Sequence, residues 1–427
     1  MYKILCSIMC ICLAAFAHGQ TGYVFDSSTN QPIEGAIINL LPSGKTTVTN
    51  TTGKFEFKNQ TTTTIRVISI GYQTKEINLS NFKNNTTIQL APAQAQLENV
   101  IIVAGNGNQF KPISQTDIAM RGVNNSQEVL RIIPGIVIGQ HQGGGKAEQI
   151  FLRGFDADHG TDFREDVDGL PVNMVSHAHG QGFADSHFII PETIESVDFN
   201  KGPYAVTKGD FATTGYVDFN LKNALPSNLV KIESGMFNTY RVLGMFNLLN
   251  SAAKQKQQSL YMATEYRYAD AYFDNPQHFN RFNFFTKYNG KISRRSYLTA
   301  SATTFWSKWN ASGQIPDRAV NEGIIGFYGA LDPFEGGKTY RTNVNVQLTT
   351  ALDNGGIIKN QVYYSNSYFD LHTDFTFFLE DSINGDEIRQ REKRNLMGYN
   401  GSYNFSKNIG DVKATTELGL NVRADLT

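Results

Sequence analysis

The sequence has 427 residues and a formal net charge of −1, because 38 Lys and Arg are balanced by 39 Asp and Glu. A chain this close to neutral lacks the basic excess of a nucleic-acid-binding protein, so nucleic acid is excluded as a partner. Charged residues make up 18% of the chain, aromatic residues 12%, and no apolar run after residue 20 is long enough for a spanning helix. This composition favours a secreted β protein or a membrane β-barrel.

Residues 1–19 have the pattern of a secretory signal peptide. Lys3 precedes an apolar stretch that ends at Ala17, and Gly19 supplies a second small residue. Signal peptidase prefers small residues two apart at its cleavage site, so we predict cleavage between Gly19 and Gln20. All three cysteines lie at or before residue 12, so the mature chain would have no thiol for a disulfide or a cysteine–zinc site.

Residues 20–91 contain short β-type runs separated by Gly, Pro and Asn, at a spacing typical of a small β-sandwich. Phe55 and Phe57 alternate with charged neighbours, which predicts one buried face. The pattern G-Y-V-F-D … P-I-E-G-A-I-I-N-L … T-N-T-T-G-K-F-E-F … I-G-Y resembles the carboxypeptidase-regulatory-like domain. Such domains precede many outer-membrane receptors of the Bacteroidetes type, so the resemblance implies a receptor of this kind.

Residues 92–112 are interpreted as a linker that carries one short apolar run, V-I-I-V. This run is either one more strand of the sandwich or an exposed strand that adds to the sheet edge of another protein. Its position and content resemble the TonB box, by which such receptors engage an inner-membrane energiser. The predicted box comprises Glu98, Asn99, Val100, Ile101, Ile102, Val103 and Ala104.

Residues 113–222 have a mixed α/β pattern. A helix capped by Asn125 or Ser126 is predicted to run to Ile133, because Pro134 and Gly135 then stop it. Further on, Asp168-Gly169 stands between two strand-like arms and predicts a tight hairpin.

Four motifs in this region resemble, in order, those of the plug domain of TonB-dependent receptors. Leu152–Gly154 corresponds to the family's I-R-G, and Val167–Val172 to V-D-G-V-P. Lys201–Pro203 corresponds to R-G-P, and Gly215–Phe219 to G-x-I-N-I. Lys201 and the run G-D-F-A-T-T-G depart from the commonest pattern, which we interpret as marks of a subfamily. The plug-motif residues are Arg153, Gly154, Asp168, Gly169, Pro171, Lys201, Gly202 and Pro203.

Residues 223–427 repeat strands in which apolar and polar residues alternate, as in T-N-V-N-V-Q-L-T and E-L-G-L-N-V-R-A-D-L. About nine such runs approach the ~9–11 residues that cross a bilayer at a tilt, with apolar side chains outward and polar ones inward. Lipid cannot satisfy backbone polar groups, so these strands must pair with one another. The predicted fold is mainly β: a small β-sandwich, an α/β plug domain and the first part of an antiparallel transmembrane β-barrel.

The barrel is expected to be incomplete in this sequence. The resemblance implies a barrel of about 22 strands, and about nine strands cannot enclose a plug that runs from residue 113 to residue 222. An open sheet would also expose two unpaired strand edges. We therefore expect residues 223–427 to be the N-terminal part of the barrel.

The resemblance implies active import of a scarce ligand across the outer membrane, with no enzymatic activity and no cofactor. Because no phosphate-binding G-x-x-x-x-G-K-[ST] loop occurs, the energy must come through a partner, a TonB–ExbB–ExbD-type complex. The other expected partners are outer-membrane lipid and a small-molecule or metal-complex ligand. An iron–siderophore or other metal complex is the leading ligand class. Cobalamin or oligosaccharide import, and a surface receptor without transport, are the alternatives.

Three of the eight histidines lie in V-S-H-A-H-G-Q-G-F-A-D-S-H-F at 175–188. Imidazole suits Zn, Cu, Fe and Ni, so a metal site is predicted from His177, His179, Asp185 and His187. The alternative is a polar loop that packs on its neighbours or contacts an organic ligand, since no fixed zinc spacing is matched. The H-x-x-x-H pattern with an adjacent Glu is absent, which argues against a metallohydrolase.

Three further residues are candidates for ligand contact. His159 and Asp162 lie in an acidic run upstream of the histidine segment. Arg318 lies within residues 309–338, which lack strand alternation and are predicted to form a long extracellular loop.

Overall fold

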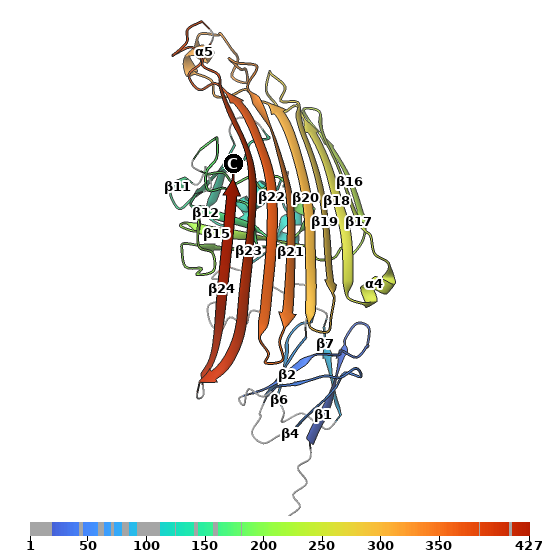
Figure 1. Ribbon diagram of the computed structural model, residues 1–427. Coiled ribbons are helices and arrows are strands. Elements are labelled where there is room, and N and C mark those ends of the chain that lie inside the picture. Colours follow the sequence, from blue (N-terminus) through green and yellow to red (C-terminus); the bar gives the residue numbers. More distant parts are fainter. Residues whose placement is uncertain are drawn as a thin grey trace, which may run out of the picture.

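The computed structural model describes residues 19–41, 46–58, 64–69, 72–78, 85–91, 112–123, 125–140, 144–156, 161–180, 182–383, 385–409 and 412–427. The predicted TonB box, His159 and residues 1–18 of the predicted signal peptide lie outside these ranges. The described chain is mainly β, as predicted, and is built from a small N-terminal domain, a central domain and one large sheet (Figure 1). None of the described helices is long and apolar enough to cross a membrane.

The N-terminal domain consists of two small sheets that share one apolar core. The first has the order β4 (Lys54–Lys58), β1 (Gly19–Asp26), β7 (Thr86–Leu90). The second has the order β3 (Thr46–Val48), β2 (Ile37–Leu41), β5 (Thr64–Ile68), β6 (Lys75–Asn78). Phe55 and Phe57 are buried in the shared core whereas Glu56 is exposed, so the predicted one-sided burial of this strand is confirmed.

The central domain contains two sheets and short helices. Its larger sheet has the order β13 (Leu170–Pro171), β12 (Phe163–Val167), β15 (Gly215–Leu221), β14 (Ile194–Lys201), β8 (Ile113–Ser114). The smaller sheet has the order β11 (Phe155–Asp156), β10 (Gln149–Leu152), β9 (Ile136–Gly139). The helical segments are α2 (Gln115–Ala119), α3 (Ser126–Val129), η3 (Leu130–Ile132) and η4 (Pro191–Thr193).

The predicted helix of the central domain forms, but it is shorter than expected. The side chain of Asn125 caps it by accepting a hydrogen bond from the backbone N–H of Glu128 at 2.9 Å. The α-helix ends at Val129 and continues as a 3₁₀ turn to Ile132. The helix tightens in its last turn before Pro134, as helices often do near their ends.

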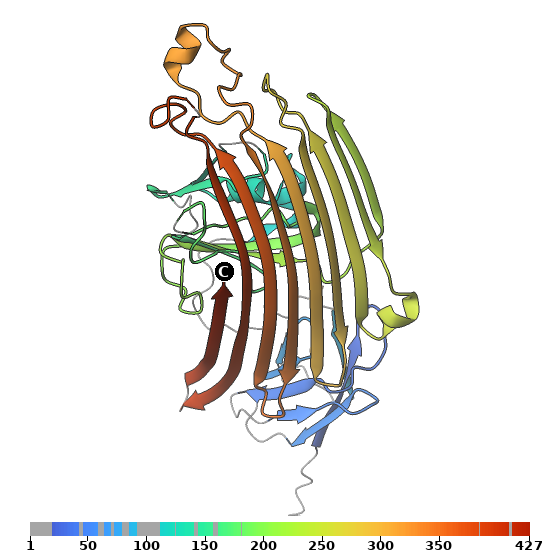
Figure 2. The same ribbon diagram turned by 45° about the horizontal axis from the view of Figure 1, so that its top comes forward.

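The large sheet has nine antiparallel strands in sequence order. They are β16 (Leu229–Gly235), β17 (Thr239–Asn247), β18 (Gln258–Ala269), β19 (Phe279–Lys291), β20 (Ser296–Asn310), β21 (Gly336–Ala351), β22 (Ile357–Thr373), β23 (Ile388–Ile409) and β24 (Val412–Leu426). The sheet curves around the central domain, which lies on its concave side (Figures 1 and 2). Among the described residues β16 and β24 are not paired with each other, so the sheet is open.

The predicted alternation of the large sheet is confirmed. On β21, Asn343 and Asn345 are 3% and 6% exposed and face the central domain, whereas Val344 between them is 43% exposed. The predicted loop at 309–338 is too long at both ends, because Asn310 still pairs with Gly336. The loop therefore spans residues 311–335, and it carries α5 (Asp317–Asn321) at the end of the sheet opposite the N-terminal domain (Figure 1).

The N-terminal domain docks on the hairpin turns at the other end of the sheet, near α4 (Ser251–Gln255). Glu34 forms an ion pair with Arg294, in the turn between β19 and β20, at 2.8 Å. The hydroxyl of Tyr72 accepts a hydrogen bond from Gln257 Nε2 at 2.6 Å and donates one to Asp26 Oδ2 at 2.8 Å. Ile37 packs in a small apolar cluster with Tyr297 and Ala351 of the sheet.

A disulfide between Gly35→Cys and Arg294→Cys is expected to lock this docked arrangement. A Cβ at Gly35 would lie 3.8 Å from the Cβ of Arg294, which is close to the ~3.8 Å mean of protein disulfides. The positive φ of Gly35 makes cysteine less favourable there, by about 1–2 kcal/mol. Non-reducing electrophoresis after mild oxidation should show a species that reductant abolishes. The control pair is Glu56→Cys with Arg294→Cys, since Glu56 is exposed on β4. Equal crosslinking of both pairs would contradict the docking.

Candidate functional site

The central domain meets the large sheet at a tight hairpin turn. Strands β12 and β13 are joined by Asp168 and Gly169, because Val167 pairs directly with Leu170. Both turn residues have positive φ, +47° and +75°, which is the type I′ geometry that Asp-Gly favours. A Cβ at Gly169 would lie 2.7 Å from Gln361 Oε1 of β22, so glycine permits this close approach to the sheet.

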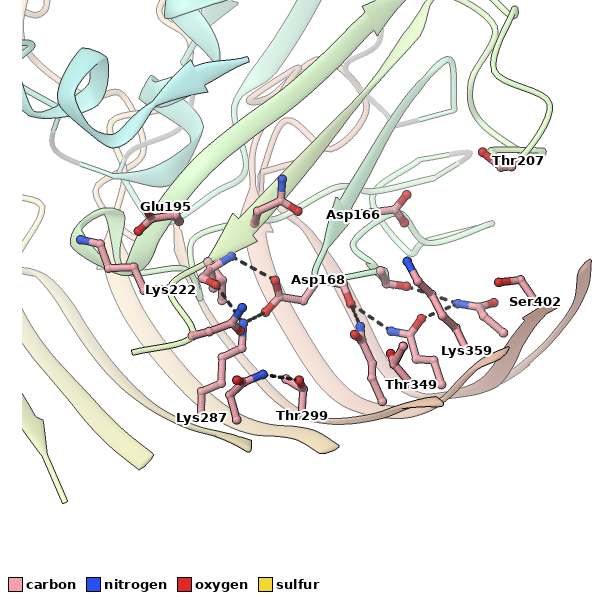
Figure 3. A pocket seen from close by; sticks show the side chains of 18 of the residues that line it. Asp166, Asp168, Glu195, Thr207, Lys222, Lys287, Thr299, Thr349, Lys359 and Ser402 are labelled. Atoms are coloured by element: carbon pink, nitrogen blue, oxygen red, sulfur yellow. Dashed lines mark hydrogen bonds and ion pairs between the residues drawn. The ribbon is translucent and has the colours of Figure 1, made fainter. Parts of the chain in front are cut away.

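The carboxylate of Asp168 is bonded on both oxygens. Lys287 Nζ, from β19, lies 2.8 Å from Oδ2, and the backbone N–H of Leu221 donates to Oδ1 at 3.0 Å (Figure 3). Lys287 also donates to the carbonyl of Leu221 at 2.9 Å, and it is 2% exposed. The ion pair is therefore buried between the two parts of the chain, where removing one partner is costly.

The backbone carbonyls of the same turn accept hydrogen bonds from amide side chains of the sheet. Asn345 Nδ2 and Gln361 Nε2 each donate to the carbonyl of Asp168 at 3.0 Å. Gln347 donates to the same carbonyl, and Asn400 Nδ2 lies 3.4 Å from that of Gly169. Amides from three neighbouring strands thus hold one turn.

Arg341 of β21 holds the residues that follow the turn. Its guanidinium donates to the carbonyls of Pro171 and Val172 at 2.9 and 3.0 Å. The remaining Nε donates to Asn343 Oδ1 and Ser365 Oγ, at 2.9 and 3.1 Å, within the sheet. Arg341 is 3% exposed, so its charge is offset by oxygen acceptors rather than by water.

A second anchor joins η4 to the opposite edge of the sheet. Arg241 of β17 makes a two-pronged contact with the Glu192 carboxylate, at 2.8 and 2.7 Å, and its Nε donates to Glu265 at 2.6 Å. Burial would raise the pKa of Glu192, but the bonds to Arg241 outweigh this effect and lower that pKa to about 2. Glu192 is therefore ionised over the physiological range, and the ion pair persists.

A cavity of about 1140 Å³ lies between the central domain and strands β19–β24 (Figure 3). The central domain lines it with Asp166, Asp168 and Lys208, and the sheet with Lys287, Lys359 and Gln361. The Asp168–Gly169 turn borders this cavity, so the anchors described above lie beside a polar space.

Two family models match the chain, CarboxypepD_reg-like domain at residues 20–102 and TonB-dependent Receptor Plug Domain at residues 106–216. The chain carries the plug domain of the TonB-dependent receptors. It is accordingly an outer-membrane protein, its central domain is a plug, and the large sheet is barrel wall. The family expected from the motifs is confirmed.

Proteins similar to this receptor include transporters and receptors of the same family. The vitamin B12 transporter BtuB of Vibrio vulnificus (strain YJ016) is 24% identical over 145 residues, 34% of this chain and 21% of that protein. The ferric citrate transporter FecA has a TM-score of 0.60 at 12% identity, over 75% of this chain and 49% of that one. The ferripyoverdine receptor of Pseudomonas aeruginosa has a TM-score of 0.57 at 13% identity, over 83% and 48%. The chain thus spans half or less of the length of these relatives.

The plug-motif residues fall into three groups in the receptor. Asp168, Gly169 and Pro171 lie at the contact with the barrel wall. Arg153 and Gly154 instead form the turn between β10 and β11. The remaining motif residues lie at the end of β14: Lys201 is its last residue, and the backbone N–H of Gly202 donates to the carbonyl of Thr214 at 2.6 Å ahead of Pro203.

The predicted metal-binding residues divide into two pairs. The ring of His177 stacks on Phe183 at a centroid distance of 4.2 Å and meets the edge of Phe369 at 4.7 Å. Its Nδ1 accepts a hydrogen bond from the backbone N–H of His179 at 3.2 Å. Burial lowers the pKa of His177 to about 3, so the ring is neutral. His179 Nδ1 lies 3.0 Å from Gln390 Oε1 of the wall.

The second pair is His187 and Asp185, whose Nδ1 and Oδ1 atoms lie 3.0 Å apart. Burial would raise the pKa of Asp185, but the neighbouring His187 lowers it on balance. Within the described ranges no three His, Cys, Asp or Glu side chains are grouped so as to hold a metal ion. The metal site therefore stays a prediction, and the observed contacts of His177 are those of the alternative, a polar loop that packs on its neighbours.

The ligand-contact candidates are not brought together. Asp162 precedes β12 in the plug, where its carbonyl accepts a hydrogen bond from Thr214 at 2.9 Å. Arg318 is exposed in α5, in the loop between β20 and β21.

The strongest anchors, Lys287, Arg341 and Arg241, were missed in the sequence analysis. Each is an ionisable side chain on the inward side of an alternating transmembrane strand. Inward-facing ionisable residues of a barrel strand line its polar interior and can pair with the plug, so this position was the available signal.

Proposed function

We propose that the complete receptor imports a scarce ligand and that energy transmitted from a partner moves the plug. The observation that carries the proposal is the way the Asp168–Gly169 turn is held against the wall. Its contacts are hydrogen bonds and one ion pair, which water and ligand groups can replace as the plug moves. These polar contacts hold the turn while the plug is at rest. Other polar groups can replace them without exposing a large apolar surface.

The proposed energy source is a TonB–ExbB–ExbD-type complex that engages residues 98–104. A short extended segment can add to the sheet edge of such a partner through main-chain hydrogen bonds. This segment precedes the plug in the sequence, so tension on it would be transmitted to β8 and α2 at the start of the plug.

The proposed ligand is an iron–siderophore or another metal complex. Support comes from the similar structures named for ferric citrate and ferripyoverdine. Import of cobalamin is a second candidate, because a relative over part of the chain is a vitamin B12 transporter. Oligosaccharide import and a surface receptor without transport are the remaining alternatives.

Deletion of residues 98–104 from the receptor expressed from its complete gene is expected to abolish energised uptake. Ligand binding at the cell surface should remain, because the deleted segment precedes the plug. The assay follows radiolabelled iron chelates with and without a protonophore. Deletion of residues 105–111, which shortens the chain by the same length, is the matched control. Protonophore-sensitive uptake that survives loss of 98–104 would refute the coupling.

A further inference from the structure

A continuous row of neutral polar side chains crosses the inner face of the barrel wall. Backbone pairing places Asn289 opposite Thr299, Thr299 opposite Gln347, and Gln347 opposite Gln361. The register then continues from Gln361 to Asn400 and from Asn400 to Asn421. We call these six residues the polar row: Asn289, Thr299, Gln347, Gln361, Asn400 and Asn421, one from each of strands β19–β24.

Every member of the polar row lines the cavity between plug and wall. Asn289 Nδ2 donates to Thr299 Oγ1 at 2.7 Å, and Asn400 Nδ2 donates to Gln361 Oε1 at 2.9 Å (Figure 3). Two positions next to the row face outward and are apolar: Val362 is 53% exposed and Leu420 is 62% exposed. The alternation of the strands thus places the polar row on the inner side of the wall.

The middle of the polar row already binds oxygen acceptors. Gln361, Gln347 and Asn400 donate to the carbonyls of the Asp168–Gly169 turn. If the plug turn withdraws, these amide donors need other acceptors, because an amide left unpaired in a confined space is unfavourable. Water or oxygen atoms of a solute can take the place of the two carbonyls.

The row extends beyond the groups that hold the plug. Thr299 accepts its hydrogen bond from Asn289, a neighbour in the wall. Asn421 lies on β24, two strands beyond Gln361, and is exposed. Only the central amides hold the turn. The outer members of the polar row therefore extend its donors and acceptors across the cavity, beyond what the turn requires.

We infer that the polar row is a transit site for a hydrophilic ligand rich in oxygen acceptors, such as a carboxylate- or hydroxamate-bearing metal chelate. The inference rests on the proposed import function and adds the side of the plug on which the ligand passes. Amide and hydroxyl groups bind carbonyl, carboxylate and hydroxyl oxygens, and they carry no charge that would trap an anionic chelate. The plug turn holds the central donors at rest and exposes them when it moves.

The test removes row members that do not hold the plug turn. Thr299→Val combined with Asn421→Leu keeps the branching of both side chains while deleting a hydroxyl and an amide. Uptake of ferric citrate and of a ferric hydroxamate is measured in cells that express the receptor from its complete gene. The maximal uptake rate is expected to fall about fivefold or more, since each lost hydrogen bond weakens binding by a factor of this size. Affinity at the cell surface should not change.

The matched control is Thr304→Val on the same strand. Thr304 faces outward, where its hydroxyl lies 3.0 Å from that of Thr342, so the same substitution should leave uptake unchanged. Equal uptake rates for the double variant and Thr304→Val would overturn the transit site. A loss of surface affinity in the double variant would also overturn it, because the row would then belong to the outer binding site. Absence of protonophore-sensitive uptake of either chelate by the unmodified receptor would instead refute the proposed function.

Discussion

Replacement of Lys287 with Met is expected to destabilise the packing of the plug against the barrel wall by about 3–5 kcal/mol. The ammonium of Lys287 lies 2.8 Å from Asp168 Oδ2 and is 2% exposed. Methionine fills the volume but leaves the Asp168 carboxylate buried without its counter-charge, and it removes one donor from the carbonyl of Leu221. The measurement is the urea dependence of plug release in detergent, which proteolysis of plug segments detects.

Two further variants make this result specific. Lys287→Met with Asp168→Asn should recover most of the lost stability, because asparagine tolerates the positive φ and can still accept from Leu221. Lys338→Met is the matched control, because its ammonium is half exposed and 3.7 Å from Asp370. Exposed pairs of this kind contribute about 0–1 kcal/mol. If Lys287→Met resembles Lys338→Met, the buried ion pair does not hold the plug.

Glu165→Gln is expected to stabilise the plug increasingly as the pH rises. Glu165 lies on β12 and is fully buried, and burial raises its pKa from 4.5 to about 8. The folded plug therefore retains a proton on Glu165 between these values, whereas the unfolded plug has lost it. The contribution of protonated Glu165 to the stability of the plug is fully present below pH 4.5 and is lost as the pH rises through 8. Glutamine mimics the protonated form and avoids this loss. The stability difference between the variant and the wild type should therefore grow by up to about 1.4 kcal/mol per pH unit in that window.

Hydrogen exchange of the β12 amides in detergent, corrected for intrinsic rates, measures this effect between pH 5 and 9. The difference between variant and wild type should grow up to about pH 8 and then level off. His177 has the opposite dependence, since its lowered pKa destabilises the plug as the pH falls from 6.5 towards 3. It is present in both proteins, so it cancels in the difference. Glu195→Gln, on neighbouring β14, is the control. A pH-independent difference for Glu165→Gln would contradict the assigned ionisation.

Much of the architecture could be predicted from the sequence, because the deciding signals are local. The alternation around Val344 distinguishes the two faces of a strand, and Asp168-Gly169 specifies a tight turn whose backbone geometry suits those residues. The motif order identified the plug, and the matching family model confirms it. The domain boundaries and the TonB box stay predictions, and the box lies outside the described residues.

The histidine segment shows where sequence reasoning stopped. Spacing alone could not distinguish a metal site from packing, because both place polar side chains in a loop. His177 lies between Phe183 and Phe369, and Phe369 belongs to a strand far along the chain. Without that neighbour, the sequence offered no sign that the ring is enclosed by aromatic side chains.

The sequence by itself determined which residues face inward, where the chain turns and to which family it belongs, since each depends on a few neighbouring residues. Only the tertiary structure decided which inward residues meet. Lys287 reaches Asp168 across 119 positions, and the polar row exists because strand register aligns one residue from each of six strands. The register of the strands and the position of the plug against the wall arise from the packing of distant segments. This packing leaves no local pattern in the sequence.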